Sequence, residues 1–153
     1  MKNYFLILTI AIGLSACNGN KIYSKFDKDF DENRWNRNDV RTFEFSVEKE
    51  QEYDLIIDFS HVYGYQFDKV PLKMVLTDSA GNKTVEQIKL DILNDEGHDN
   101  GNCDGDYCDL YDTVFQNQKL KPGKYKVEVT NEFNHEYLPN VIGLGIQVLI
   151  SKK

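Results

Sequence analysis

The sequence predicts an all-β protein, folded as an antiparallel β-sandwich of roughly seven to eight strands. Apolar and polar residues alternate with period two along most of the chain, and turn-forming clusters separate the alternating runs. No stretch of ten or more residues shows a helical apolar stripe. Strands with one apolar and one polar face are typical of antiparallel sheets packed on a single core. A barrel is the alternative arrangement of the same strands.

Residues 1–16 are expected to form a signal peptide that is cleaved from the fold. A positively charged start precedes an apolar run of eleven residues over 4–14. This run is too short to cross about 30 Å of hydrocarbon, so it does not predict a transmembrane helix. The run ends in Leu14-Ser15-Ala16-Cys17, which resembles the lipobox of bacterial lipoproteins. That resemblance implies cleavage before Cys17 and acylation of its sulfur and its new amine.

Acylated Cys17 makes a lipid membrane the first expected partner. Each buried acyl CH₂ contributes roughly 0.8 kcal/mol, and two or more chains anchor a protein stably. Residues 17–28 are expected to form a lipidated tether that becomes a first strand or docks on the body, and residues 29–153 the sandwich domain. No acidic cluster directly follows Cys17. In Bacteroidetes lipoproteins such clusters resemble a surface-export signal, so we expect the cell envelope, with the periplasmic face of the outer membrane favoured.

The expected strands follow one another from residue 43 to the C-terminus. A turn-rich cluster over 78–82 and a Pro-Gly turn over 121–124 separate some of them. Their alternating positions are Phe43, Phe45 and Val47; Tyr53, Leu55, Ile57 and Phe59; Leu72, Met74 and Leu76; Ile88, Leu90 and Ile92; Tyr111, Thr113 and Phe115; Tyr125, Val127 and Val129; and Leu144, Ile146, Val148 and Ile150.

One segment carries the net charge of the chain. The formal net charge is −7, and eight acids with no Lys or Arg lie from Asp91 to Asp112. The rest of the chain after residue 16 has 17 bases and 17 acids. An acidic protein without a basic face does not suit nucleic acid, because phosphate contacts need Lys and Arg. We therefore expect no nucleic-acid partner.

Cys103 and Cys108 lie inside this acidic segment. Two cysteines in an exported chain favour a disulfide, here closing a tight Cys-x₄-Cys loop. Gly105 within the loop relieves backbone strain. Zinc bound by both cysteines and His98 is the alternative, and an oxidising compartment counts against it.

The same segment approaches the oxygen-ligand spacing of a Ca²⁺ loop. The fit is imperfect, because its first position is Asn and its twelfth is Tyr111. The favoured interpretation is a solvated acidic hairpin tip held by the disulfide, with bound Ca²⁺ as the alternative. No other cofactor is expected. The candidate metal ligands are Asn100, Asn102, Asp104, Asp106 and Asp112.

Two aromatic features permit a binding or a packing interpretation, and packing is favoured for both. Trp35 lies between Arg34 and Arg37, and the run over 61–67 interleaves aromatic and polar residues. Trp35 is either a partner-binding hot spot or a side chain that closes the edge of the core. The 61–67 run is either a sugar-stacking loop or ordinary loop packing. No nucleophile elbow, His-Glu-x-x-His or phosphate loop occurs, and the three His share no motif. The sequence therefore predicts that the protein is not an enzyme.

The order of these features resembles the GldH family of gliding-motility lipoproteins from the Bacteroidetes. The resemblance implies a non-enzymatic lipoprotein needed for movement over surfaces, with protein partners in a motility complex and no catalytic residues. A lipid-anchored module that binds carbohydrate or Ca²⁺ is the alternative function. The matching residues after Cys17 are Trp35, Asp39, Phe43 and Phe45; Tyr53, Leu55 and Ile57; Tyr65, Phe67 and Leu72; Pro122, Gly123, Tyr125 and Val127; and Leu138, Gly143, Leu144 and Ile146.

Overall fold

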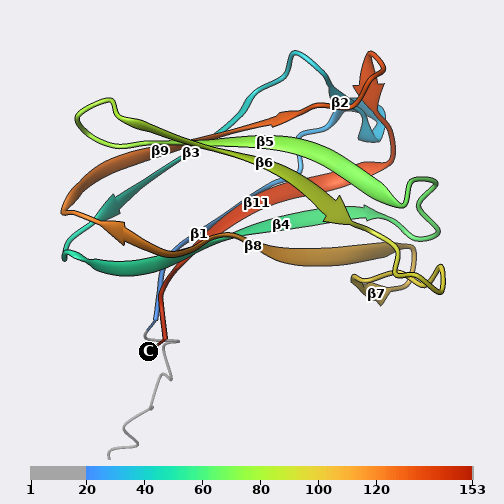
Figure 1. Cartoon of the computed structure of the whole chain (residues 1–153). Coiled ribbons are helices and arrows are strands. Elements are labelled where there is room, and N and C mark those ends of the chain that lie inside the picture. Colours follow the sequence, from blue (N-terminus) through green and yellow to red (C-terminus); the bar gives the residue numbers. More distant parts are fainter. Residues whose placement is uncertain (1–19, 153) are drawn as a thin grey trace, which may run out of the picture.

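Two antiparallel sheets face each other across one hydrophobic core (Figure 1). The structure is a computed structural model and describes residues 20–152. The predicted all-β sandwich is confirmed, and the two sheets share no strand pairing, so no barrel closes among these residues. The signal peptide expected over 1–16 and the acylation site Cys17 lie outside the described residues.

The described chain forms eleven strands and one short 3-10 helix. The larger sheet has the strand order β1-β11-β4-β8-β7, the smaller sheet β3-β9-β5-β6, and β10 pairs with β2 as a separate ribbon. No helix among residues 20–152 is long and apolar enough to span a bilayer. In chain order the elements are β1 (Lys21–Asp27), η1 (Asp31–Asn33), β2 (Trp35–Asn36), β3 (Arg41–Val47), β4 (Gln51–Val62), β5 (Lys69–Thr77), β6 (Lys83–Asp91), β7 (Asn102–Asp104), β8 (Tyr107–Leu120), β9 (Gly123–Asn131), β10 (Tyr137–Leu138) and β11 (Val141–Ile150).

The strand count exceeds the predicted seven to eight for two reasons. Strands β2, β7 and β10 have two or three residues each, which is too short to show alternation in the sequence. Strand β1 lies within 17–28, the range expected to be a tether, and it pairs with β11 at the edge of the larger sheet. The sandwich therefore begins before residue 29, and most of the expected tether belongs to the folded body.

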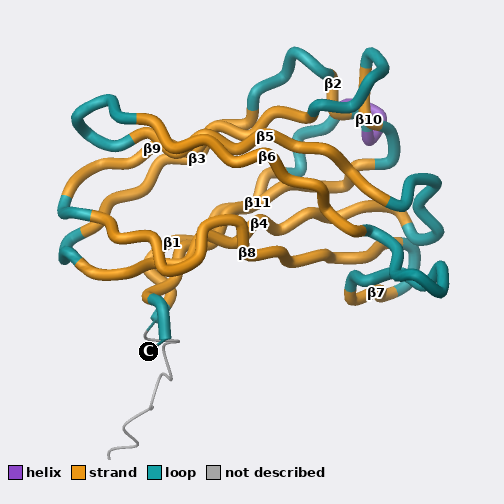
Figure 2. The backbone as a smooth tube through the Cα atoms, in the orientation of Figure 1, coloured by secondary structure: helices purple, strands orange, loops and turns teal. Residues whose placement is uncertain are grey.

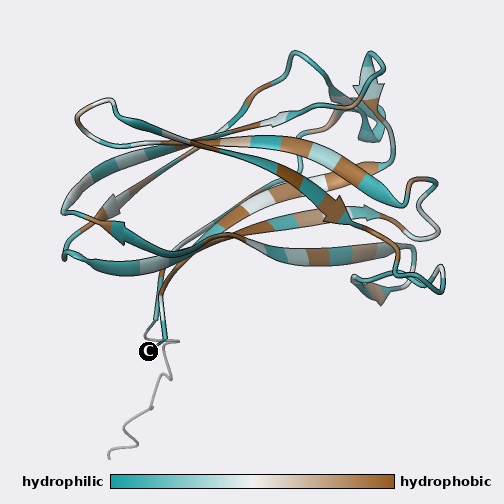
Figure 3. Cartoon of the chain, in the orientation of Figure 1, coloured by the Kyte–Doolittle hydropathy of each residue, from teal (hydrophilic) through white to brown (hydrophobic). Residues whose placement is uncertain are grey.

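Strand β4 shows how the sequence builds the core. Tyr53, Leu55, Ile57 and Phe59 are all buried, as their alternation predicts. Strands β5 and β9 in the facing sheet bury alternate residues in the same way. Figure 3 shows the corresponding hydrophobic segments along the strands, while most loops are hydrophilic. Full burial of one such apolar side chain is worth roughly 1.5–3 kcal/mol relative to exposure, so this alternation drives the packing.

Three tight turns and both ends of the described chain lie at one end of the sandwich, which we name the turn end. The turns span 48–50, 78–82 and 121–122. Strand β1 begins there and β11 ends there, and the Ile150 amide donates to the Asn20 carbonyl oxygen at 2.7 Å.

The opposite end, which we name the loop end, carries the four longer connections of the described chain (Figure 2). They span 28–40, 63–68, 92–101 and 132–140, and they include η1 and the β2–β10 ribbon. Apart from the two-residue turn of the β7–β8 hairpin, the topology thus separates short turns from long loops.

Candidate functional site

The Cys103–Cys108 disulfide closes the β7–β8 hairpin at the loop end. The two cysteines are direct cross-strand partners. Gly105, in the turn between them, has a φ of 64°, which glycine adopts without steric cost. Cys108 is fully buried, whereas Cys103 is exposed. The predicted pairing is therefore present, and it fixes the short hairpin to the sandwich.

A buried histidine that the sequence analysis assigned to packing, and not to a site, lies beside this disulfide. His61 is the cross-strand partner of Cys108 in the β4–β8 pair, and its Nε2 lies 3.7 Å from Oδ1 of Asp99. His61 Nε2 and Asp99 Oδ2 are buried without a hydrogen-bond partner in the chain. The period-two spacing of Tyr53, Leu55, Ile57 and Phe59 could have revealed His61, because it occupies the next position on the same face of β4.

His61, Asp99 and Cys108 are the one group of described residues whose ligand atoms gather closely enough for a metal ion, all within 4.8 Å. In a disulfide, Cys108 has no thiolate to offer. One imidazole and one carboxylate are fewer than the three protein ligands of a catalytic zinc site. The zinc alternative relied on His98, whose side chain is 75 % exposed and lies near Glu96 instead. The geometry favours the disulfide over zinc.

The three acids among the five residues predicted as candidate Ca²⁺ ligands lie outside the one close group of metal-ligating side chains in the described residues. All five are exposed. A Ca²⁺ ion needs six to eight oxygens within about 2.6 Å, usually supplied by a loop that wraps around it. The predicted residues are instead spread along an extended hairpin, with Asn100 before it, Asn102 and Asp104 on β7, Asp106 in its turn, and Asp112 on β8.

The aromatic run over 61–67 mainly packs at the loop end. Tyr65 is buried, and its hydroxyl donates to the Pro139 carbonyl oxygen at 2.9 Å. Burial raises the pKa of Tyr65 above the ordinary range. Its ring contacts the rings of His61 and Phe67. The packing interpretation is confirmed for these side chains.

Trp35 closes the core at the same end. It is fully buried, and its Nε1 donates to the Asp39 carbonyl oxygen at 2.8 Å. The Phe30 ring packs edge-on against it at 5.8 Å, and the Arg41 guanidinium covers Phe30 at 4.0 Å. Trp35 is therefore the core plug that the sequence interpretation favoured.

A pocket of about 340 Å³ opens on the outer face of the larger sheet, toward the loop end; we name it the outer-face pocket. Phe26 of β1 lies across Gly143 and Gly145 of β11, and a Cβ on either glycine would collide with its ring. The two glycines let this aromatic ring lie flat on the sheet. In the neighbouring β4–β8 pair, Ser60 is opposite Asp109 and Asp58 is opposite Tyr111, and all four side chains line the pocket.

Asp58 is the electrostatic anomaly of this pocket. It is only 9 % exposed, and its Oδ1 has no hydrogen-bond partner in the chain. Burial, followed by the negative charge of Asp109, raises the pKa of Asp58 to about 6, against the lowering effect of Gln147, Lys21 and Tyr111. Near neutral pH the protein therefore holds a buried, incompletely paired carboxylate beside a second one.

The sequence placed Tyr111 on the wrong face of its strand. The alternation of Tyr111, Thr113 and Phe115 predicted that they share one face, yet Tyr111 is exposed and Phe115 is buried. The register of β8 against β4 shifts between Leu55 and Ile56, where a bulge inserts one extra residue on β8. The bulge reverses the phase of the strand, so Tyr111 faces outward into the pocket.

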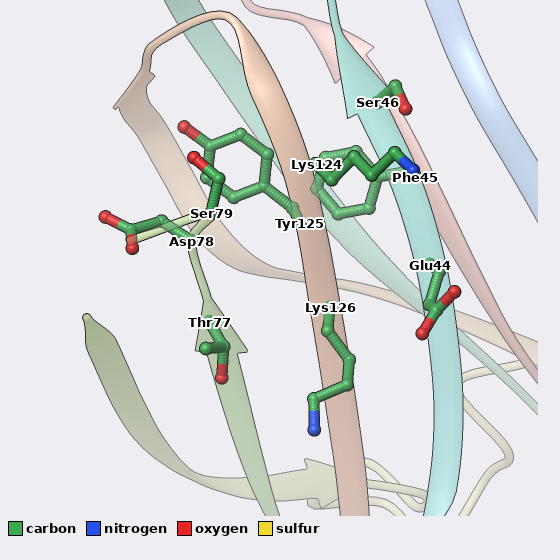
Figure 4. A pocket seen from close by; sticks show the side chains of 9 residues that line it. All are labelled: Glu44, Phe45, Ser46, Thr77, Asp78, Ser79, Lys124, Tyr125 and Lys126. Carbon is green, nitrogen blue, oxygen red and sulfur yellow. The ribbon is translucent and has the colours of Figure 1, made fainter. Parts of the chain in front are cut away.

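A second pocket, of about 490 Å³, lies on the smaller sheet near the turn end (Figure 4). Its Asp78 carboxylate already accepts three hydrogen bonds, from Ala80 and Asn82. The Lys126 amine lies 3.1 Å from a Glu128 carboxylate oxygen. Because these two charged groups have partners within the chain, this pocket is a weaker candidate than the one around Asp58.

Solved structures resemble this fold only weakly. A protein from Sulfurospirillum deleyianum is 14 % identical with a TM-score of 0.41, over 86 % of this chain and 99 % of that one. TmCBM61, solved with β-1,4-galactotriose, is 12 % identical with a TM-score of 0.33, over 85 % and 82 %. A chain of the T13 IBDV viral particle is 10 % identical with a TM-score of 0.38, over 95 % and 36 %. Structural similarity this low supports no conclusion about function.

No curated protein matches the sequence. A family comparison, in contrast, aligns residues 21–148 with the GldH lipoprotein family. The aligned range begins at the first residue of β1 and ends inside β11, so it covers nearly the whole sandwich. A lipoprotein family implies association with a membrane of the cell envelope through a lipid anchor. The match agrees with the resemblance found along the sequence, and the chain belongs to the GldH lipoprotein family.

Proposed function

We propose that this protein is a non-catalytic structural or assembly component of the gliding-motility machinery, anchored through acylated Cys17 to the periplasmic face of the outer membrane. The observation that carries the proposal is the family match over residues 21–148. The lipobox-like sequence ending at Cys17 supports it, because it supplies the anchor that a lipoprotein needs.

The arrangement of the sandwich supports a body held close to the membrane by its turn end. Cys17 precedes the first residue of β1 by four positions. A fully extended chain of that length reaches about 14 Å. The loop end lies at the far end of the strands from the start of β1 (Figure 1). We infer that the loop end is the part presented to protein partners.

The acidic hairpin is a negatively charged feature of the loop end. Asp104 and Asp106 are exposed there, and the disulfide holds their backbone to β8. A rigid, negatively charged tip suits a partner with a basic surface, because charge complementarity steers association and fixes register. We propose that this tip takes part in docking to a motility partner.

The experiment is a clean deletion in the native host, complemented with the wild type or with Cys17→Ala. Cells moving on glass are counted by microscopy, and immunoblots of membrane fractions report the amount and place of the protein. Loss of movement on deletion, restored by the wild type and not by Cys17→Ala, is the expected result. Normal gliding of deleted cells would overturn the proposed function.

A second pair of variants tests the loop end separately from the anchor. Asp104→Asn with Asp106→Asn removes two charges from the hairpin tip. Glu48→Gln with Glu86→Gln removes two exposed charges elsewhere and serves as the matched control. We expect the first pair to reduce movement at unchanged protein level and the control pair to leave it intact. Equal movement in both would place the partner surface elsewhere.

A further inference from the structure

The walls of the outer-face pocket are aromatic. Tyr107 and Tyr111 both point outward from β8, with 45 % and 53 % of their surface exposed. Phe26 forms the opposite wall, on the other side of Asp58. Exposed aromatic faces attract the weakly positive C–H groups of a ligand, because the face of a π system carries partial negative charge.

The floor of the pocket supplies hydrogen-bond acceptors. Asp58 Oδ1 is buried without a partner, and Asp109 and Ser60 lie beside it on the paired strands. A buried acceptor that stays unpaired is costly, because it has lost its hydrogen bonds to water without replacing them. Hydroxyl groups of a ligand would satisfy these oxygens. Apolar walls with a few convergent polar groups are typical of small-molecule sites, and the volume of about 340 Å³ falls in their range.

The charges in the pocket exclude an anionic ligand. Asp58 and Asp109 would repel an anion. Lys28 lines the same pocket, with its Nζ 5.7 Å from the Phe26 ring centroid, so its amine offsets part of the negative charge and adds a hydrogen-bond donor. Carboxylates, a hydroxyl and an amine together can accept from and donate to many hydroxyl groups.

We propose that the outer-face pocket binds a neutral carbohydrate. The C–H face of a sugar ring packs on Tyr111 or Tyr107, and its hydroxyl groups donate to Asp58 and Asp109. This inference rests on the pocket alone and stands whether or not the protein serves gliding. Its consequence is a lipoprotein that holds glycan on one sheet face and leaves its loop end free.

The test uses the full-length protein in a detergent without a sugar head group. Gluco-, galacto-, manno- and xylo-oligosaccharides are screened on an array and binding is measured by titration calorimetry. Choline chloride and sialyllactose serve as the cationic and anionic probes. We expect binding of at least one neutral oligosaccharide class and no binding of either charged probe.

Variants connect the binding to the pocket. Tyr111→Ala and Asp109→Asn should each weaken binding by about tenfold or more, while Tyr111→Phe, which keeps the ring, should stay within about threefold of the wild type. Tyr63→Ala is the matched control, because Tyr63 is 62 % exposed and does not line the pocket. Thermal melts check that each variant is folded.

Three results would overturn the proposal: no binding of any neutral oligosaccharide, binding of choline or sialyllactose alone, or equal affinity in the wild type and Asp109→Asn. If Tyr111→Ala fails to fold, the conservative Tyr111→Phe and Asp109→Asn variants still decide the outcome, because both keep the side-chain volume nearly unchanged.

Discussion

The turn end and the loop end of the sandwich differ in how their connections are held. At the turn end the Tyr53 hydroxyl donates to the Lys49 carbonyl oxygen, and the Tyr125 hydroxyl donates to the Lys121 carbonyl oxygen, both at 2.9 Å. The remaining turn is held by the Asp78 carboxylate, which accepts three hydrogen bonds. Each tight turn therefore has a side chain that fixes its backbone.

The half of the sandwich nearer the loop end leaves more of its buried polar groups unpaired. Six buried side-chain atoms among the described residues have no partner in the chain, and only Thr77 Oγ1 belongs to the turn end. Such groups are costly, and in native proteins most buried polar groups have a partner in the protein or in ordered water. The comparison teaches that buried side chains pair with one another more completely toward the turn end than toward the loop end. The atoms on the loop-end half are Arg41 Nε, Asp58 Oδ1, His61 Nε2, Asp99 Oδ2 and Asn131 Oδ1.

The largest difference between the two ends should come from their aromatic residues. Trp35→Ala removes a fully buried plug from the loop end and should destabilise the protein by about 3–5 kcal/mol through lost burial and a cavity. Tyr125→Phe removes only a hydroxyl at the turn end and should cost about 1 kcal/mol. Urea unfolding followed by fluorescence or circular dichroism measures both. Equal losses would contradict the assignment of Trp35 as the plug.

Asp58→Asn should stabilise the protein above pH 6. The pKa of Asp58 is raised from 3.8 to about 6, so between these values the folded state keeps a proton that the unfolded state has released. Stability from this group is therefore highest below pH 3.8, falls as pH rises to about 6, and stays reduced above. A shift of about two units corresponds to at most about 3 kcal/mol.

The measurement for Asp58→Asn is the free energy of unfolding at pH 4 and at pH 7.5. We expect a gain of about 1–3 kcal/mol at the higher pH and nearly no change at the lower. If Asp58→Asn is more stable but binds carbohydrate more weakly, the buried charge contributes to binding and lowers the stability of the fold. A loss of stability at pH 7.5 would refute the electrostatic account.

Cys103→Ser should have an intermediate effect. The disulfide closes a short ring, for which the loop-entropy relation gives about 2 kcal/mol. Wild-type protein treated with a phosphine reductant should lose the same amount, whereas the variant should not respond to the reductant. Thermal melts with and without reductant measure this. Free thiols in the untreated wild type, or an unchanged melting temperature, would contradict it.

The sequence predicted the fold better than the candidate sites, and β4 and β8 show why. Alternation along β4 identifies the residues that face the core, although Asp58 and Ser60 on the opposite face are buried as well. On β8, the bulge opposite Leu55 and Ile56 reverses the phase, and a local pattern cannot show an extra residue that is defined by pairing with another strand. Tyr111 was therefore predicted on the wrong face.

The pocket itself could not be predicted from one segment. Phe26, Asp58 and Tyr111 come from three strands and meet only through the sheet register. Cys103 and Cys108 were predictable, because their pairing needs only their spacing and the oxidising compartment. The burial of His61 could have been predicted from the sequence, because it occupies the next inward-facing position after Phe59.

Calcium should have the smallest effect of all. Strands rise about 3.3 Å per residue, so β8 carries Asp112 about 17 Å from Tyr107, and a single ion cannot contact both Asp112 and the acids of the hairpin tip. Millimolar CaCl₂ should therefore shift the melting temperature no more than MgCl₂ of equal ionic strength, through screening of like charges alone. A Ca²⁺-specific rise that saturates with concentration would instead reveal a real site. Asp104→Asn with Asp106→Asn should abolish that rise only if the hairpin tip binds the ion. The variants that test docking would therefore also decide whether the hairpin tip binds a cation or a protein partner.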